Sequence, residues 1–283
     1  MDNSLLAVRD INHKYIVVVE KSGIDKSKEN GYNETVLVIA LQDGFTMRRS
    51  LIVEDILLIE PAYKNKYPPI GLMKIAYFHR YIMHDYVRFA KGRLPEGLEN
   101  KKWDRVYVTT LFTFEWENTK KALQYALSVV KPGGKVFTGG ILATLRPEWI
   151  AKEFPTVINN TGLLNHEGTL GLKGEECIDT LPLDYGILDD IKDEYKYPAE
   201  DAYFTYMTRG CGMNCTFCAV KTLEPTYEPY VSISDSIKRI DKEFGPKRDL
   251  LLMDNNVLRS PKFDQIIDEI KALGFEKGAT FVN

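Results

Sequence analysis

The chain has 283 residues, of which 44% are hydrophobic and 27% are charged. This length exceeds that of a usual single domain, so we expect two domains, and the composition argues against disorder. The formal net charge of −3 provides no basic excess for nucleic acid. Residues 1–10 have no apolar core of a signal peptide, and no later stretch reaches the roughly 18 apolar residues of a membrane span. We therefore expect a cytoplasmic protein that contacts neither nucleic acid nor a membrane.

Residues 1–53 are expected to form a β-rich extension. Two apolar runs, at 15–20 and 35–40, flank a polar stretch that contains glycine and asparagine. This pattern predicts two strands joined by a loop. We find no chemical motif in this extension.

Strand-like and helix-like segments alternate over residues 54–162. The near-continuous apolar run at 55–61 is typical of a strand in a parallel sheet. Strands joined by helices require right-handed crossovers, which predicts a doubly wound, Rossmann-like parallel sheet. The expected strands are 55–61, 86–89, 104–110 and 135–138, and the expected helices begin at Pro68 and near Asn118, the second ending at Pro132, Gly133 and Gly134.

The remaining chain divides into a connection and a second alternating segment. Residues 163–200 have weak periodicity and many glycine, proline and acidic residues, so we expect them to link two domains. Residues 201–283 then alternate again between strand and helix. The expected strands are 202–207, 250–253 and 280–282, and the expected helices are 234–244 and 262–273.

Three of the four cysteines lie within eight residues, directly after the expected strand at 202–207. Cys211, Cys215 and Cys218 have the spacing C-x3-C-x2-C, which is typical of a metal site in a reducing compartment. Three thiolates on one loop can ligate three irons of a four-iron, four-sulfur cluster (4Fe-4S) and leave the fourth iron open. The remaining cysteine, Cys177, is expected to be a small buried hydrophobic residue.

A zinc site and a chance grouping of three cysteines are the alternative interpretations. Structural zinc usually has four ligands, and the chain has no second cysteine pair or cysteine–histidine pair. His79, His84 and His166 are scattered along the sequence. We therefore favour the iron-sulfur cluster.

The cysteine segment resembles the signature of the radical S-adenosylmethionine (radical SAM) superfamily, C-x3-C-x-aromatic-C, with Phe217 in the aromatic position. The resemblance implies that S-adenosyl-L-methionine chelates the open iron and that the reduced cluster cleaves it to a 5'-deoxyadenosyl radical. It also implies that Phe217 packs near the adenine, although a plain core role stays open. An electron donor such as a flavodoxin or ferredoxin is implied as a partner.

Asp254, Asn255 and Asn256 follow the second expected barrel strand, at the end where barrel enzymes place ligand groups. The family often has a Gly-Gly-Glu-like motif there, which receives the amine of the cofactor, and this chain departs from it. We interpret the polar triplet as a cofactor-binding candidate. A turn or helix-cap role stays open for Asn255 and Asn256.

Residues 60–72 and 139–148 resemble the cobalamin-binding type of domain that precedes the barrel in one branch of the superfamily. Gly139 and Gly140 would allow close approach of a ligand at a strand end. The D-x-H-x-x-G sequence of many such domains is absent, and Leu142 stands where the family pattern has histidine. Two interpretations stay open: the domain binds cobalamin without a protein histidine, or it only covers the barrel mouth or positions a substrate.

The predicted fold is therefore α/β, with a doubly wound sheet of the cobalamin-binding type followed by the first half of a partial (β/α) barrel. A radical SAM barrel normally has about six strand–helix units, and three strands are expected here. A truncated gene, a partner chain that completes the barrel and a shortened non-catalytic descendant are the three explanations.

Two functions follow as hypotheses. The first is a radical SAM enzyme, or its N-terminal portion, that performs cobalamin-dependent methyl transfer or carbon-skeleton chemistry on a small-molecule or peptide substrate. The second is a non-catalytic iron-sulfur or metal-binding protein, or a partner subunit. Arg209, Tyr63 and Glu148 lie near expected strand ends as candidate pocket residues, each with a structural role as the stronger interpretation.

Overall fold

The structure is a computed structural model. It describes residues 4–11, 14–23, 32–41, 44–46, 53–92, 97–172, 177–191, 195 and 201–275, and in the first four of these stretches only the course of the backbone. The chain divides into two compact units, residues 1–54 with 83–85 and residues 55–82 with 86–283. The strand expected at 280–282 lies outside the described residues.

The first unit contains a four-stranded antiparallel sheet in the order β1-β2-β3-β4. The two apolar runs expected as strands lie in β2 and β3, which pair from Tyr15 with Ala40 to Gly23 with Tyr32. Both expected strands are thus confirmed. The bounds are β1 (Ser4–Ile11), β2 (Lys14–Gly23), β3 (Tyr32–Leu41) and β4 (Gly44–Thr46).

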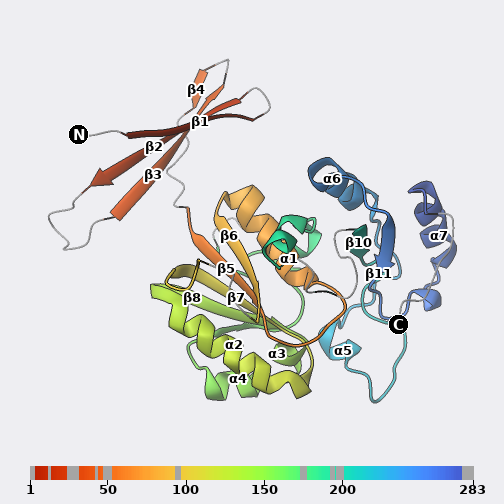
Figure 1. Cartoon of the computed structure of the whole chain (residues 1–283). Coiled ribbons are helices and arrows are strands. Elements are labelled where there is room, and N and C mark those ends of the chain that lie inside the picture. The colour runs from red at the N-terminus through yellow and green to blue at the C-terminus, as the bar shows by residue number, and fades with distance from the viewer. Residues whose placement is uncertain are drawn as a thin grey trace. The chain divides into compact units, whose positions relative to one another are not determined.

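The second unit is built on a five-stranded parallel sheet in the order β6-β5-β7-β8-β9 (Figure 1). The chain passes from β5 outward to β6, then returns and continues from β7 on the other side of β5. The order therefore reverses between β5 and β7, as in doubly wound flavodoxin-like sheets. This confirms the predicted Rossmann-like sheet. The bounds are β5 (Asp55–Glu60), β6 (Tyr86–Lys91), β7 (Trp103–Thr110), β8 (Val130–Gly140) and β9 (Ile158–Asn160).

Helices cross over both faces of this sheet (Figure 1). On one face, α1 (Ile70–Tyr77) continues into a π-helix (Phe78–Met83) and leads to β6. On the other face, a short 3-10 turn (Thr113–Glu115) opens α2 (Trp116–Val129), and α3 (Ile141–Leu145) and α4 (Pro147–Glu153) precede β9. In the described part of the chain, every helix falls short of the length and apolar character needed to cross a bilayer.

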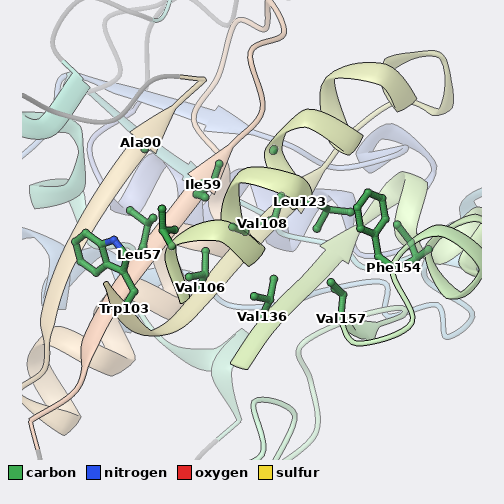
Figure 2. Packing of buried hydrophobic residues seen from close by; sticks show 14 of the residues in the cluster. Leu57, Ile59, Ala90, Trp103, Val106, Val108, Leu123, Val136, Phe154 and Val157 are labelled. Carbon is green, nitrogen blue, oxygen red and sulfur yellow. The ribbon is translucent and has the colours of Figure 1, made fainter. Parts of the chain in front are cut away.

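The main core lies between the sheet and α2. Residues 56–59 of β5 are all buried, and alternate side chains point to opposite faces, so Leu57 and Ile59 meet α2. Figure 2 shows this core extending from Trp103 to Phe154 and Val157. Helix α2 contributes Ala122, Leu123, Ala126 and Val129, an apolar stripe with helical spacing.

Strand β8 begins earlier than expected. The predicted strand started at Lys135, but the structure starts it at Val130, which pairs with Trp103. The register shifts before Lys135 pairs with Arg105, and Gly133 has a φ of 81° in the intervening segment. In this irregularity residues 131–134 of β8 lie opposite the single residue 104 of β7, which accommodates a proline without a backbone donor and a left-handed glycine inside a strand.

Residues 177–191 form a packed connection. Two 3-10 helices, Ile178–Thr180 and Tyr185–Ile191, contact α1, and the second also contacts β6. Asp190 binds Arg88 of β6, with 2.9 Å between Oδ1 and Nε. The buried residues here are Ile178, Leu181, Pro182, Leu183, Asp184, Tyr185, Ile187 and Leu188.

The last described segment begins a second parallel sheet. Strand β10 (Ala202–Thr205) pairs in parallel with β11 (Asp249–Leu252), and α6 (Ser234–Phe244) connects them. Two short helices, α5 (Val220–Leu223) and the 3-10 turn Val257–Arg259, and a final helix, α7 (Phe263–Ala272), complete this segment. These strand–helix units are those of the partial barrel that the sequence predicts.

Candidate functional site

A cavity of about 710 Å³ opens at the carboxyl ends of the five-stranded sheet. Its lining includes the last residues of four strands: Glu60, Thr110, Gly140 and Asn160. This is the position at which open α/β sheets bind ligands, next to the point where strand order reverses. The volume lies within the range of about 300–1,000 Å³ that is typical of ligand pockets. The barrel segment lines the cavity with Tyr206, Arg209, Leu223, Glu224, Met253 and Asn255.

Gly139 and Gly140, the predicted cofactor-binding glycines, lie in the wall of this cavity. Gly140 has a φ of 107° and a ψ of −164°, a conformation that is essentially restricted to glycine. A Cβ at this position would overlap the carbonyl oxygen of Thr110 on β7. The Thr110 hydroxyl also donates to the Gly139 carbonyl (2.9 Å) and accepts from the Ala143 amide (3.0 Å). The absence of side chains therefore lets β7 and β8 meet closely at the cavity.

A buried charge pair closes the β5–β6 side of the cavity. Glu60 is 1% exposed, and its Oε2 lies 2.8 Å from Nζ of Lys91. Asn65 donates to Oε1 at 2.6 Å, and the Tyr195 hydroxyl donates to Oε2. Burial raises the pKa of Glu60, and Lys91 opposes that rise. Both carboxylate oxygens of Glu60 have partners, so the Glu60–Lys91 pair stabilises this wall of the cavity and does not provide a free acid or base.

The three signature cysteines lie on the loop between β10 and α5. Cys211 is half-buried, while Cys215 and Cys218 are exposed, and all three are free thiols. The Cys218 amide donates to the Cys215 carbonyl at 3.2 Å, and the Met213 amide donates to Sγ of Cys211 at 3.5 Å. Within the described ranges, no three His, Cys, Asp or Glu side chains are gathered to hold a metal ion. The donor set, three thiols on one loop, fits an iron-sulfur cluster.

Phe217 is 92% exposed on this loop. A core role is therefore wrong for this side chain, and its ring is free to contact a ligand or another protein. It is not one of the described residues that line the cavity.

The polar triplet after β11 lies beside the cysteine loop, as expected from the parallel pairing of β10 and β11. Asp254 accepts from the amides of Met207 (3.1 Å) and Thr208 (2.5 Å), so its carboxylate joins the carboxyl ends of both strands. Asn255 lines the cavity. Asn256 has its Nδ2 4.0 Å from Sγ of Cys211. Asp254 is thus engaged in a structural contact, and the two asparagines lie nearer to the cavity and to the first thiol.

A row of alternating charges forms the wall between α1 and the cysteine loop. Lys74 of α1 binds Asp179 at 2.8 Å, Asp179 lies 3.4 Å from Arg209, and Arg209 lies 3.3 Å from Glu224. Burial lowers the pKa of Lys74, against the attraction of Asp179. Burial would raise the pKa of Asp179, but Lys74 and Arg209 outweigh it, so that pKa is lowered. All four residues line the cavity.

Of the three candidate pocket residues, two line the cavity. Tyr63 is buried, and burial raises the pKa of its hydroxyl. Arg209 belongs to the charged wall, with its guanidinium 4.5 Å from the centre of the Tyr206 ring. Glu148 is exposed in the first turn of α4 and is not part of the described lining.

No histidine belongs to the described lining of the cavity. His79 is buried elsewhere, with Nε2 3.0 Å from the Tyr107 hydroxyl. Leu142, which stands at the family's histidine position, is fully buried in the α2 core. Cys177 is half-buried, and its Sγ lies 3.8 Å from the Leu164 carbonyl oxygen.

Lys74, Asp179 and Glu224 were not predicted as site residues, because no local motif marks them. Lys74 and Asp179 are 105 positions apart, and their pairing depends on how the connection folds back onto α1. Glu224 follows the cysteine signature by six residues. Its short distance from the signature was the one available signal.

The architecture defined by these features is a doubly wound, Rossmann-like sheet domain joined to the start of a second parallel strand–helix segment, a partial barrel. Three solved structures with this architecture resemble the chain, and all are of the cobalamin-dependent S-adenosylmethionine radical enzyme OxsB. The form with aqua-cobalamin and S-adenosylmethionine bound aligns with a TM-score of 0.55 and 13% identity over 99% of this chain. The form with aqua-cobalamin alone gives 0.53 over 96%, and the apo form gives 0.51 over 99%, each at 13% identity.

The chain spans about half the length of these structures, 48% in each case. At this identity the likeness establishes the fold, α/β with a Rossmann-like sheet and a partial barrel, and confirms the predicted fold class. No family model matches the chain, and no curated protein sequence does so.

Proposed function

We propose that this chain is a radical SAM iron-sulfur enzyme, or the N-terminal portion of one. The observation that carries the proposal is the position of the cysteine loop. It leaves the carboxyl end of β10, and residues on both sides of it, Arg209 and Glu224, line the cavity at the carboxyl ends of the Rossmann-like sheet. A group bound by the cysteine loop and a ligand bound at the carboxyl ends of the sheet would therefore lie in the same cavity.

In this proposal Cys211, Cys215 and Cys218 ligate a 4Fe-4S cluster. When bound, the cluster would supply the electron that cleaves S-adenosyl-L-methionine to methionine and a 5'-deoxyadenosyl radical. The chain's own contribution is positional. Asn256 lies next to Cys211 and Asn255 faces the cavity, so both amides can bind polar groups of the cofactor. The exposed ring of Phe217 is available to pack on the adenine.

We propose further that cobalamin is the ligand of the cavity. Its support is the cavity volume, the close-packed Gly139 and Gly140 at the end of β8, and the fold shared with a cobalamin-dependent enzyme. The absence of histidine from the described lining means that cobalamin would bind here without a histidine ligand from those residues. Methyl transfer or carbon-skeleton chemistry on a small molecule or peptide is the reaction class that these two cofactors suit.

The exposed side of the cysteine loop suits an electron-transfer partner, and we propose a flavodoxin or ferredoxin. Cys215, Cys218 and Phe217 are all exposed there. The free state of all four cysteines fits a reducing, cytoplasmic compartment. A partner chain that completes the barrel would extend the β10–β11 pair.

A non-catalytic metal-binding protein, or a partner subunit of an enzyme, is the second candidate. The observation that favours it is the exposure of the loop, on which two of the three thiols, those of Cys215 and Cys218, are exposed. The three thiols could then hold an iron-sulfur cluster that does not bind S-adenosylmethionine.

Anaerobic reconstitution with iron and sulfide tests both candidates. The enzyme proposal expects about four irons per chain, cluster absorbance, and 5'-deoxyadenosine after reduction in the presence of S-adenosylmethionine. The Cys211→Ser, Cys215→Ser and Cys218→Ser variants should lose the cluster, whereas Cys177→Ser, the matched control, should keep it. A cluster without cofactor cleavage would overturn the enzyme proposal for this chain. A colourless, zinc-loaded protein purified anaerobically would overturn the iron-sulfur proposal altogether.

Cobalamin binding has its own test. All three tryptophans of the chain, Trp103, Trp116 and Trp149, belong to the five-stranded sheet domain. Titration with aqua-cobalamin should therefore quench tryptophan fluorescence in a saturable way. A linear, non-saturating loss of fluorescence would contradict cobalamin as the cavity ligand and leave the cluster proposal untouched.

A further inference from the structure

The carboxylate of Glu224 connects the cysteine loop to the segment after β11. Its Oε2 accepts from the Gly210 amide at 2.6 Å and from Nδ2 of Asn255 at 2.9 Å. Its Oε1 lies 3.3 Å from Nη1 of Arg209. The Glu224 side chain is 12% exposed, so these contacts replace most of its hydration. One largely shielded carboxylate therefore contacts Gly210, the residue before Cys211, and a residue of the polar triplet.

The backbone around Gly210 leaves the loop little freedom at this end. Gly210 has a φ of 64°, and a Cβ there would lie 2.5 Å from the Thr226 carbonyl oxygen. Arg209 and Glu228 exchange two backbone hydrogen bonds of 3.0 Å, which close the ends of the loop. Because the ends of the loop are joined, the direction in which the loop leaves β10 depends on the orientation of the Gly210 amide. The partner of that amide is Glu224.

The hydrogen-bond donors and the positive charge around Glu224 stabilise its carboxylate in this position. A buried carboxylate needs donors and a counter-charge, and Glu224 has two N–H donors and Arg209. Arg209 also binds Asp179 through its other terminal nitrogen, Nη2, and Asp179 binds Lys74 of α1. Glu224, which binds the Gly210 amide of the cysteine loop, is thus connected through Arg209 and Asp179 to the Rossmann-like sheet domain as well as to the barrel segment.

We propose that Glu224 is a positioning residue for the cysteine loop. It orients the Gly210 amide, and with it the first thiol, Cys211. It also holds Asn255, so that Asn256 stays next to the same thiol. The part of this inference that concerns a bound cluster rests on the proposed function. The part that concerns the orientation of the Cys211 thiol does not.

Glu269 provides a matched control. Its Oε1 accepts from the amides of Ile233 and Ser234, both at 3.0 Å, and its Oε2 accepts from the Tyr230 hydroxyl at 2.8 Å. Like Glu224, it is a carboxylate that fixes backbone amides within the barrel segment. It binds the start of α6 instead of the cysteine loop, so a general loss of stability should affect both variants alike.

The first experiment uses the full-length, metal-free protein. Cysteine alkylation is followed residue by residue with mass spectrometry for wild type, Glu224→Ala, Glu224→Gln and Glu269→Ala. Loss of a charged hydrogen-bond acceptor should raise the alkylation rate of Cys211 roughly tenfold in Glu224→Ala, and the already exposed Cys215 should change by less than about twofold. Glu224→Gln retains a carbonyl acceptor and should lie between wild type and Glu224→Ala. Glu269→Ala should leave the ratio of the Cys211 and Cys215 rates unchanged.

An unchanged ratio in folded Glu224→Ala, or an equal change in Glu269→Ala, would overturn the inference. Circular dichroism establishes whether each variant folds. If Glu224→Ala does not fold, Glu224→Asp takes its place, because it keeps the charge and withdraws the oxygens by one methylene. The same Cys211-specific increase is expected from it, and a wild-type ratio would equally overturn the inference.

The second experiment uses reconstituted protein. Glu224→Ala should bind iron, lose cluster absorbance to a chelator at least about fivefold faster than wild type or Glu269→Ala, and show an altered electron paramagnetic resonance line shape after reduction. A wild-type chain that binds no cluster would contradict the proposed function, and the alkylation ratio would still decide the role of Glu224. A wild-type cluster with identical chelation and spectra in Glu224→Ala would contradict the positioning role alone.

Discussion

The Gly140→Ala substitution would place a methyl group where the carboxyl ends of β7 and β8 meet. Gly140 has a φ of 107° and a ψ of −164°, so alanine there costs about 1–3 kcal/mol of backbone strain. The new Cβ would also overlap the Thr110 carbonyl oxygen, and overpacking of this kind costs a further 1–3 kcal/mol or so. We therefore expect the free energy of unfolding to fall by about 2–6 kcal/mol in total.

Gly133→Ala is the control because Gly133 lies on the same strand and also has a positive φ, 81°, while a Cβ at that position would meet no other atom within 4 Å. Only the backbone cost of about 1–2 kcal/mol applies to it. The assay is urea unfolding followed by tryptophan fluorescence, since all three tryptophans lie in the five-stranded sheet domain. If Gly140→Ala were no more destabilising than Gly133→Ala, the close contact of β7 with β8 would be refuted as the reason for glycine at position 140.

Three further outcomes can be checked by the same unfolding assay. Lys91→Met should lower the free energy of unfolding by about 3–5 kcal/mol at pH 7, because it leaves the Glu60 carboxylate buried without its cation. The control Lys238→Met removes an exposed i,i+3 pair and should lower it by less than about 0.5 kcal/mol. Equal effects of the two variants would contradict the burial argument. Burial raises the pKa of Asp184 to about 6, so its ionisation opposes folding, and the stabilising effect present below pH 4 should be lost as the pH rises to 6. Asp184→Asn should remove that decline, and an unchanged pH profile would contradict the raised pKa. Leu123→Ala should cost about 2–5 kcal/mol, because Leu123 is fully buried between α2 and the sheet, and a cost below about 1 kcal/mol would contradict that packing.

The longer strands and helices of the sheet domain and the barrel segment could be predicted from the sequence because each has its own periodic pattern. The short elements β4, β9, α3, α4 and α5, and strand β1, were not predicted. The apolar run of β5 and the apolar stripe of α2 mark a buried parallel strand and a helix packed on it. The start of β8 could not be predicted in this way. Pro132, Gly133 and Gly134 are ordinary turn residues, and only the pairing of Val130 with Trp103 makes that segment part of an irregular strand.

The connection at 177–191 shows a second limit of sequence patterns. Its acidic residues and weak periodicity are typical of a linker, yet Asp184 is fully buried and binds Arg80 at 2.9 Å. Asp190 binds Arg88 across a separation of 102 positions. A charged side chain can be buried once a partner is present, and the sequence does not say which partner the fold will bring near.

The features of the cysteine site also fall into two groups, those that the sequence determined and those that only the tertiary structure decided. The sequence alone determined that three thiols share one short loop after a strand and that a doubly wound sheet precedes them, because spacing and periodicity are local properties. The tertiary structure decided the rest: that Glu224 anchors this loop, that Lys74, Asp179 and Arg209 connect it to α1, and that one cavity lies between loop and sheet. These contacts join residues far apart in the chain, and they exist only because the strand order and the folded-back connection bring their charges together.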